Sequence, residues 1–271
     1  MYNAWTMSLG IVIKSPEGLV LAAESRVTLT TTHANGQQLH TNFDNATKLI
    51  SFNQPNIGVA AVTYGQAAIG IRTVNSFLPE FEANLPGDVL PVAEFSHRLS
   101  TFFLAQWNAS VPQPYQGPNI TFVVGGFDSG EPYGRVFLFD IPGAPNPVEQ
   151  SPNDFGITWG GQREIVDRLI RGYDSRLESI LQQELSLDQA ALNSILQKLA
   201  PIQMPIPIQF MGLQDHVNLA LFFIETTIAA QTLTLGIRGC GGPIDVATIT
   251  RRDGCKFVQR KEVKGRTPQR R

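Results

Sequence analysis

The sequence predicts an α+β fold of four layers, an α-β-β-α sandwich in which two sheets pack between outer helices. The first observation is composition, because 42% of the 271 residues are hydrophobic and 16% are charged, which is enough to form a sizeable core. The second is order, because segments with strand periodicity and segments with helical periodicity alternate in blocks. Such blocks favour antiparallel hairpins covered by helices over an alternating parallel sheet.

Strand-like runs open the chain as two hairpins. The first turn, residues 15–18, carries Pro16 and Gly18 at the positions that suit a type I turn. We interpret the polar stretch 28–45 as a connection between the two hairpins. The predicted strands, including the later ones, are residues 9–14, 19–23, 48–52, 57–62, 119–126, 135–141, 244–249 and 256–258.

Helical spacing marks the segments between these strands. Apolar residues at positions 68, 71, 74 and 78 share one helical face, which predicts a helix soon after Gly65. The other predicted helices run from about Asp88 to Trp107, from 162 to 184, from 187 to 199 and from about 215 to 232.

Several site classes are disfavoured. The chain has no G-x-G-x-x-G after its first strand, no P-loop and no G-x-S-x-G elbow, which argues against nucleotide binding and the α/β-hydrolases. Cys240 and Cys255 are interpreted as unpaired thiols. We expect no metal and no cofactor, because the histidines lack ligand spacing; they are His33, His40, His97 and His216.

Residues 1–258 are predicted to form a single domain, and residues 259–271 a basic, flexible tail. Residues 251–271 hold 9 of the 21 basic and 2 of the 23 acidic residues, which leaves a net charge of −9 for the rest. Without interleaved aromatic residues we expect a solvated extension and no nucleic acid. Apolar runs are shorter than the roughly 20 residues that span a bilayer, and no secretory signal is evident. We therefore expect no membrane association and a cytoplasmic location.

The segment from Met7 to Arg26 resembles, without a gap, the opening of proteasome β-type subunits, especially the ancestral bacterial β-subunit group. In that family a nucleophile begins the mature chain, a glycine follows ten residues later, and a D-[ST]-R motif starts sixteen residues later. Counting from Ser8 places Gly18 and Glu24-Ser25-Arg26 on these positions, with Glu24 replacing aspartate. The resemblance thus implies Ser8 as the nucleophile.

Two further segments resemble the family in the expected order. Asn45–Leu49 is similar to the strand that carries the catalytic lysine, here Lys48, and Ala60–Ala68 is similar to the oxyanion turn, here at Gly65. The resemblance implies that Glu24 holds Lys48, that Lys48 lowers the proton affinity of the hydroxyl, and that the Gly65 N–H binds the oxyanion.

At the level of the whole protein, the resemblance implies an N-terminal-nucleophile hydrolase of the threonine/serine-peptidase type. Its substrate would be a peptide or unfolded protein, and its copies would form a homo-oligomer, either a ring or a helical stack.

The later motifs depart from the family. Trp159-Gly160-Gly161 resembles a glycine-serine-glycine turn in which Gly160 replaces the serine. Cys240 and Ile237 stand where the family has another serine and an aspartate. A catalytically inactive structural subunit is therefore one alternative, and an amidase for a small substrate, with its pocket shaped by residues 201–212, is another.

The nucleophile must be terminal, because its own α-amino group, with a pKa near 7.7 to 8, is the base. Ser8 would become terminal by translation from Met7 and methionine removal, whereas self-cleavage before Thr6 would free that threonine instead, which makes residues 1–7 a candidate pro-segment. We favour Ser8, because Thr6 requires a two-residue insertion before Gly18 and follows Trp5 rather than glycine.

Overall fold

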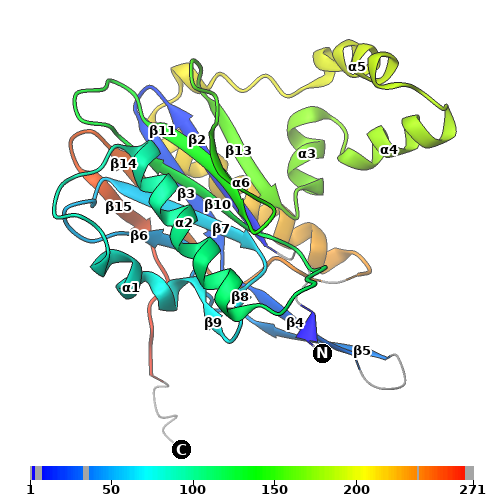
Figure 1. Ribbon diagram of the computed structural model, residues 1–271. Helices are drawn as coiled ribbons and strands as arrows, with labels where there is room; N and C mark the ends of the chain where they lie inside the picture. Colours follow the sequence, from blue (N-terminus) through cyan, green and yellow to red (C-terminus); the bar gives the residue numbers. More distant parts are fainter. Residues whose placement is uncertain (1, 4–7, 33–36, 237, 266–271) are drawn as a thin grey trace, which may run out of the picture.

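The computed structural model describes residues 2–3, 8–32, 37–236 and 238–265. Two five-stranded sheets lie face to face with helices on both outer sides, so the four-layer α-β-β-α prediction is confirmed (Figure 1). The first sheet has the order β13-β2-β3-β14-β15, and the second has the order β12-β11-β10-β7-β6.

The strands of the first sheet are β2 (Leu9–Ser15), β3 (Gly18–Glu24), β13 (Gly156–Gly161), β14 (Ile244–Thr250) and β15 (Gly254–Gln259). Those of the second are β6 (Leu49–Ser51), β7 (Val59–Gly65), β10 (Ile120–Gly126), β11 (Arg135–Ile141) and β12 (Ala144–Glu149). A separate ribbon joins β1 (Tyr2–Asn3), β4 (Val27–Thr32) and β5 (Gln38–Phe43) in the order β1-β4-β5.

The sheets are held together by aliphatic side chains from their inner faces. Val12, Leu19 and Leu21 of the first sheet pack against Val62 and Val123 of the second, and all are at most 1% exposed. Strands β2 and β3 are buried on both faces, because they lie inside a sheet that is itself covered on both sides. This explains their near-continuous apolar sequence.

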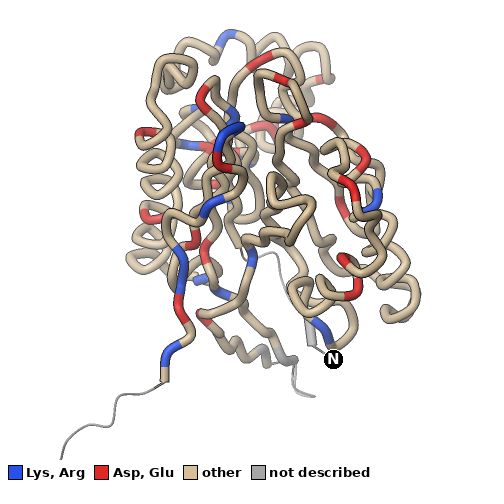
Figure 2. The backbone as a smooth tube through the Cα atoms, turned by 90° about the vertical axis from the view of Figure 1, so that its left-hand side faces the viewer, with Lys and Arg blue, Asp and Glu red and all other residues tan. Residues whose placement is uncertain are grey.

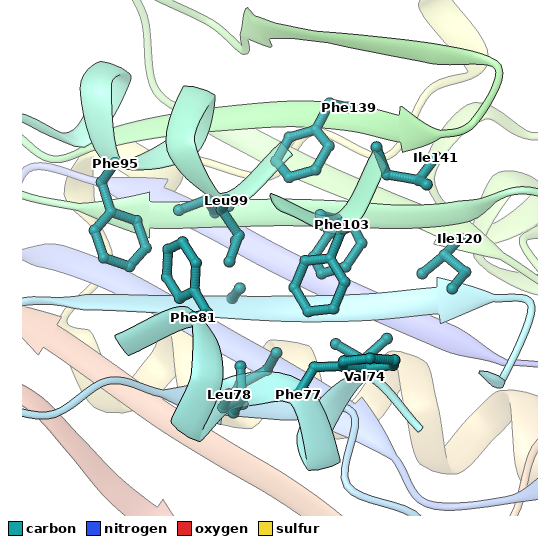
Figure 3. Packing of buried hydrophobic residues seen from close by; sticks show 14 of the residues in the cluster. Val74, Phe77, Leu78, Phe81, Phe95, Leu99, Phe103, Ile120, Phe139 and Ile141 are labelled. Atoms are coloured by element: carbon teal, nitrogen blue, oxygen red, sulfur yellow. The ribbon is translucent and has the colours of Figure 1, made fainter. Parts of the chain in front are cut away.

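An aromatic layer covers the outer face of the second sheet (Figure 3). Helix α2 (Val92–Ser110) directs Phe95, Leu99, Phe103 and Trp107 inward at three- to four-residue spacing. On the sheet below, the rings of Phe122 and Phe139 stack with centroids 5.0 Å apart. The short 3₁₀ helix η1 (Val74–Phe77) and helix α1 (Leu78–Ala83) complete this layer.

Helices α3 (Glu164–Arg171) and α6 (Leu213–Leu233) cover the first sheet. Val217, Ala220 and Phe223 of α6 pack on Leu9 and Ile11. Helices α4 (Ser175–Glu184) and α5 (Gln189–Lys198) lie away from both sheets (Figure 1), and only Leu192 of the two is buried. Two 3₁₀ turns, η2 (Ala200–Ile202) and η3 (Ile208–Phe210), connect α5 to α6.

Most predicted strands and helices are confirmed, with ends shifted by a few residues. The prediction that residues 28–45 form a connection is wrong. Strands β4 and β5 pair there, from Val27↔Phe43 to Thr32↔Gln38. Strands β12 and β13 were also not predicted. The polar β4–β5 ribbon lies outside the sandwich, so its sequence lacks the apolar alternation of a core strand.

The helix predicted from positions 68, 71, 74 and 78 is wrong at its start. Residues 68–73 form a small hairpin of β8 (Ala68–Ile69) and β9 (Arg72–Thr73), and helical structure begins only at Val74. Ile71, counted as a core position, is fully exposed. The helix predicted over 162–184 is broken into α3 and α4, because Gly172 adopts φ 82°, a left-handed conformation that terminates α3.

The chain ends lie partly outside the described residues. Thr6 and most of the predicted pro-segment 1–7 fall there, as do residues 266–271 of the predicted tail. The described part of the tail runs away from the body and carries basic and acidic residues (Figure 2), and Lys261 pairs with the buried Asp245. None of the helices in the described ranges combines the length and apolar character that a bilayer crossing requires.

The first prediction concerns Glu17 in the β2–β3 turn, whose Oε2 accepts the Leu213 N–H at 2.6 Å and so caps α6. A carboxylate at a helix N-terminus stabilises it through the free N–H groups and the helix dipole. Glu17→Ala is expected to lower the free energy of unfolding by about 1 kcal/mol, measured by urea denaturation. Glu225→Ala, an exposed site on α6, is the control. Equal effects of the two variants would contradict the capping role.

Candidate active site

A buried ion pair joins the first sheet to the start of β6. The Nζ atom of Lys48 donates a hydrogen bond to Oε1 of Glu24, the last residue of β3. The Glu24 side chain is fully buried and that of Lys48 is 7% exposed. The Lys48 backbone is held by β7, because its carbonyl accepts the Thr63 N–H at 2.8 Å. Two residues 24 positions apart are thus brought into direct contact.

Glu24 also organises the backbone around it. Its Oε1 accepts the Leu9 N–H at 3.3 Å. Its Oε2 accepts the Arg26 N–H at 2.7 Å and the Gly241 N–H at 3.0 Å. One carboxylate therefore ties together the start of β2, the segment after β3 and the loop before β14.

The charge state of Glu24 depends on these partners. Burial raises the pKa of Glu24, and the charge of Lys48 with the hydrogen bonds from Lys48, Arg26 and Gly241 acts against that rise. Removal of the lysine would leave desolvation as the dominant influence. The neutral acid would then be favoured in the folded protein.

The Lys48 ammonium group has one more hydrogen-bond donor. An ammonium group carries three donors, and in the described part of the chain Nζ uses two of them, on Glu24 and on the Arg26 carbonyl. These two acceptors fix the orientation of the group. The third N–H is therefore available to a neighbouring hydroxyl.

Ser8 immediately precedes β2 and is 4% exposed. Its carbonyl accepts the Gln162 N–H at 2.7 Å, and the next residue, Leu9, donates to Glu24. The predicted nucleophile thus lies beside the carboxylate of the ion pair. The alternative nucleophile, Thr6, lies outside the described residues.

Gly65 ends β7 with φ +92°, and a Cβ atom there would lie 2.2 Å from the Asn119 carbonyl oxygen, so only glycine fits. The N–H groups of Thr63 and Gln66 bond to Lys48 and Asn119 respectively, on opposite edges of β7. By the two-residue period of a strand, the Gly65 N–H is directed to the edge of Thr63, the edge of Lys48. This is the side on which an oxyanion donor would be needed.

Tyr64 packs between the sheets, against Gly10 and Gly160 of the first sheet. Gly10 and Gly160 are cross-strand partners, and a Cβ atom on Gly160 would lie 2.2 Å from the Tyr64 hydroxyl oxygen. A serine at position 160 would collide with this ring. Glycine at position 160 leaves the space that the Tyr64 ring occupies.

Arg26 holds the loop that precedes β14. Its guanidinium binds Asp44 through Nε at 2.6 Å and Nη2 at 2.8 Å, which lowers the pKa of Asp44. Its Nη1 donates to the carbonyl of Arg238 at 3.2 Å, and the Gly241 backbone packs against it. The arginine of the family motif thus acts here as a clamp between two loops.

Cys240 in the same loop is 1% exposed, and its Sγ lies 3.8 Å from Oε1 of Gln162. Burial, and secondarily the charge of Glu24, raises the pKa of Cys240, so the thiol is neutral. Both cysteines are unpaired, as predicted. The residues that the sequence did not indicate at this site are Tyr64, Gln162 and Gln231.

Residues 201–212, expected to shape a pocket for a small substrate, lie elsewhere. Ile208 is buried against α6, and the following residue pair, Gly212 and Leu213, adjoins the Glu17 turn. That turn is at the end of β2 opposite to Ser8. These contacts direct that part of the segment to α6 and to the β2–β3 turn.

The second prediction concerns the ion pair. Lys48→Met leaves Glu24 buried without its cation and is expected to lower the free energy of unfolding by about 3 kcal/mol or more at pH 8. Because loss of the lysine raises the folded-state pKa of Glu24 further, the variant loses more stability than the parent protein as pH rises above about 4.3, the ordinary glutamate value. Urea denaturation at pH 5 and pH 8 measures the difference.

Lys256→Met is the control for this prediction, since it breaks the exposed Lys256–Asp253 pair. Surface pairs contribute about 0 to 1 kcal/mol. The double variant Lys48→Met with Glu24→Gln is expected to lose the pH dependence. A Lys48→Met protein as stable at pH 8 as at pH 5 would contradict the buried pair.

The third prediction concerns Cys240. Because the thiol is buried and neutral, iodoacetamide at pH 8 is expected to leave Cys240 unmodified in the native protein and to alkylate it after unfolding, as measured by peptide mass. Cys255, whose pKa is raised to about 11 by partial burial, is the internal comparison. Native alkylation of Cys240 at the unfolded rate would show that this loop is open.

Comparison with known proteins places the fold. No protein-family model matches the chain, and no curated protein matches it. Many solved structures do match, and three of them each match over 94% of this chain and 88% of the other. Anbu, an ancestral beta-subunit, from Yersinia bercovieri is 15% identical with a TM-score of 0.55. The helical assembly of the Anbu complex from Pseudomonas aeruginosa is 16% identical with a TM-score of 0.56. Anbu from Hyphomicrobium sp. strain MC1 is 16% identical with a TM-score of 0.54. The chain therefore has the proteasome-like fold of N-terminal-nucleophile hydrolases.

Proposed function

We propose that this chain is a subunit of a proteasome-related assembly and that Ser8, once it is N-terminal, is the nucleophile of a peptidase. The observation that carries the proposal is the Lys48 ammonium, which is held by Glu24 and the Arg26 carbonyl beside the start of β2. A surface ion pair would not require a fully buried carboxylate with three further backbone donors. This degree of fixation is typical of a catalytic group.

The chemistry follows from the positions of the groups. The α-amino group of processed Ser8 accepts the hydroxyl proton, and the nearby Lys48 charge stabilises the resulting alkoxide. The oxygen attacks the substrate carbonyl, and the Gly65 N–H stabilises the oxyanion. The C–N bond then breaks, the leaving amine takes the proton, and water hydrolyses the serine ester. A peptide or unfolded protein is the substrate class that suits this reaction.

Assembly is part of the proposal. The Pseudomonas relative is described as a helical assembly, and we propose that this chain likewise associates with copies of itself. A heterologous contact between copies closes into a ring or continues as a helix. Light scattering on the purified protein measures the mass, and a single-chain mass at micromolar concentration would refute this part.

The fourth prediction tests the nucleophile. A hydroxyl-reactive β-lactone is expected to acylate Ser8 in processed protein, because the lysine and the free amine activate that hydroxyl. Intact mass gives the N-terminus and the adduct, and peptide mass gives the modified residue. Labelling is expected to be lost in Ser8→Ala and to persist in Thr6→Ala and in Ser15→Ala, a serine at the far end of β2.

Each remaining outcome has a defined meaning. Labelling that is lost in Thr6→Ala and kept in Ser8→Ala would assign the nucleophile to Thr6. Processed, assembled protein that takes up no label would favour the inactive structural subunit. Lys48→Ala is expected to reduce the labelling rate at least a hundredfold, because it removes the charge that stabilises the alkoxide.

A further inference from the structure

Gln231, near the end of α6, links two loops that lie on opposite sides of Ser8. Its Nε2 donates to Oε1 of Gln162, the residue that follows β13. Its Oε1 accepts the Cys240 N–H at 2.9 Å. The Cys240 thiol also approaches Oε1 of Gln162, at 3.8 Å. One amide side chain therefore connects two segments 78 residues apart.

Each of these segments makes a main-chain contact to the site. The Gln162 N–H binds the carbonyl of Ser8 at 2.7 Å. The N–H of Gly241, next to Cys240, binds Oε2 of Glu24 at 3.0 Å. These hydrogen bonds form a closed series of contacts, since Glu24 in turn binds the N–H of Leu9, the neighbour of Ser8.

We infer that Gln231 is a positioning residue for the reaction of Ser8, acting through Gln162 on the Ser8 backbone and through Cys240 and Gly241 on Glu24. The inference rests on the proposed function. Among the described residues, the hydrogen bonds of the Gln231 side chain go to Gln162 and Cys240, so it acts on Ser8 and the ion pair through the two segments that hold them.

The role requires a planar polar group of this length that can bond to both loops. Gln231 must donate to a carbonyl oxygen on one side and accept an N–H on the other, and glutamine supplies both from one planar group. The site also demands precision, because an error of about 1 Å in the placement of a reacting group can cost about a hundredfold in rate. A group that spans both loops is suited to limit that error.

The experiment measures acylation of processed full-length protein by a β-lactone, with the maximal rate constant kinact and the half-saturating concentration determined separately. Gln231→Met keeps the volume and removes both hydrogen bonds. It is expected to lower kinact about tenfold and to leave the half-saturating concentration within twofold. Gln231→Glu keeps the acceptor for Cys240, and rotation of the Gln162 amide restores a donor, so it is expected to recover most of kinact.

The control is Gln214→Met, a glutamine of the same helix that is hydrogen-bonded to Asn218 at its exposed first turn. It is expected to keep the kinact of the parent protein. A role in packing alone would be served by methionine as well as by glutamate, so a kinact of Gln231→Met equal to that of Gln231→Glu would overturn the inference. If the methionine variant does not fold, Gln231→Asn replaces it, since its amide is too short to reach both loops.

The two proposals fail in different ways. If the parent protein is acylated at Ser8 and Gln231→Met reacts at the same kinact, the positioning role is refuted and the proposed function stands. If processed parent protein is not acylated at all, the proposed function fails and the positioning role fails with it. Thermal unfolding of every variant shows whether a loss of rate reflects a loss of structure.

Discussion

The Glu24–Lys48 pair is the interaction on which the rest of the site depends. An ion pair removed from water is costly to leave incomplete, so the surrounding backbone must supply further donors. Here the start of β2 and the loop before β14 supply them to one carboxylate. The pair therefore constrains where two sheets, and two loops far apart in sequence, must meet. Contacts from Lys48, Arg26 and Gly241 oppose the rise in the pKa of Glu24, and the same carboxylate also binds the N–H of Leu9, the residue next to Ser8.

Packing bears on positions 160 and 240, where the sequence departs from the proteasome motifs that it resembles. Tyr64 occupies the volume that a side chain at position 160 would need, so glycine there follows from the tyrosine. Cys240 contributes its backbone N–H to Gln231, and this contact does not require a hydroxyl. Both positions thus take part in contacts that the structure shows, Gly160 through the space it leaves and Cys240 through its backbone N–H.

The resemblance to proteasome β-type subunits singles out Ser8, Glu24, Lys48 and Gly65 as candidates, because each lies at a fixed offset within a short motif, and the structure brings Glu24 and Lys48 into contact. Tyr64, Gln162 and Gln231 could not be predicted, since their importance arises from contacts between distant segments. The same contrast holds for the fold. Core strands such as β2 can be recognised by their apolar residues. The threonine-rich β4 lacks this signal, because it lies in a ribbon outside the sandwich.

Helices α4 and α5 carry a consequence for how this protein unfolds. With Leu192 as their only buried residue, they share almost none of the core that stabilises the sandwich. Short helices without such burial are marginal in water. Their backbone amides should therefore exchange with solvent through local opening that leaves both sheets intact. The molecule accordingly has two levels of stability, a cooperative sandwich that contains Ser8 and an appendage that opens and closes independently of it.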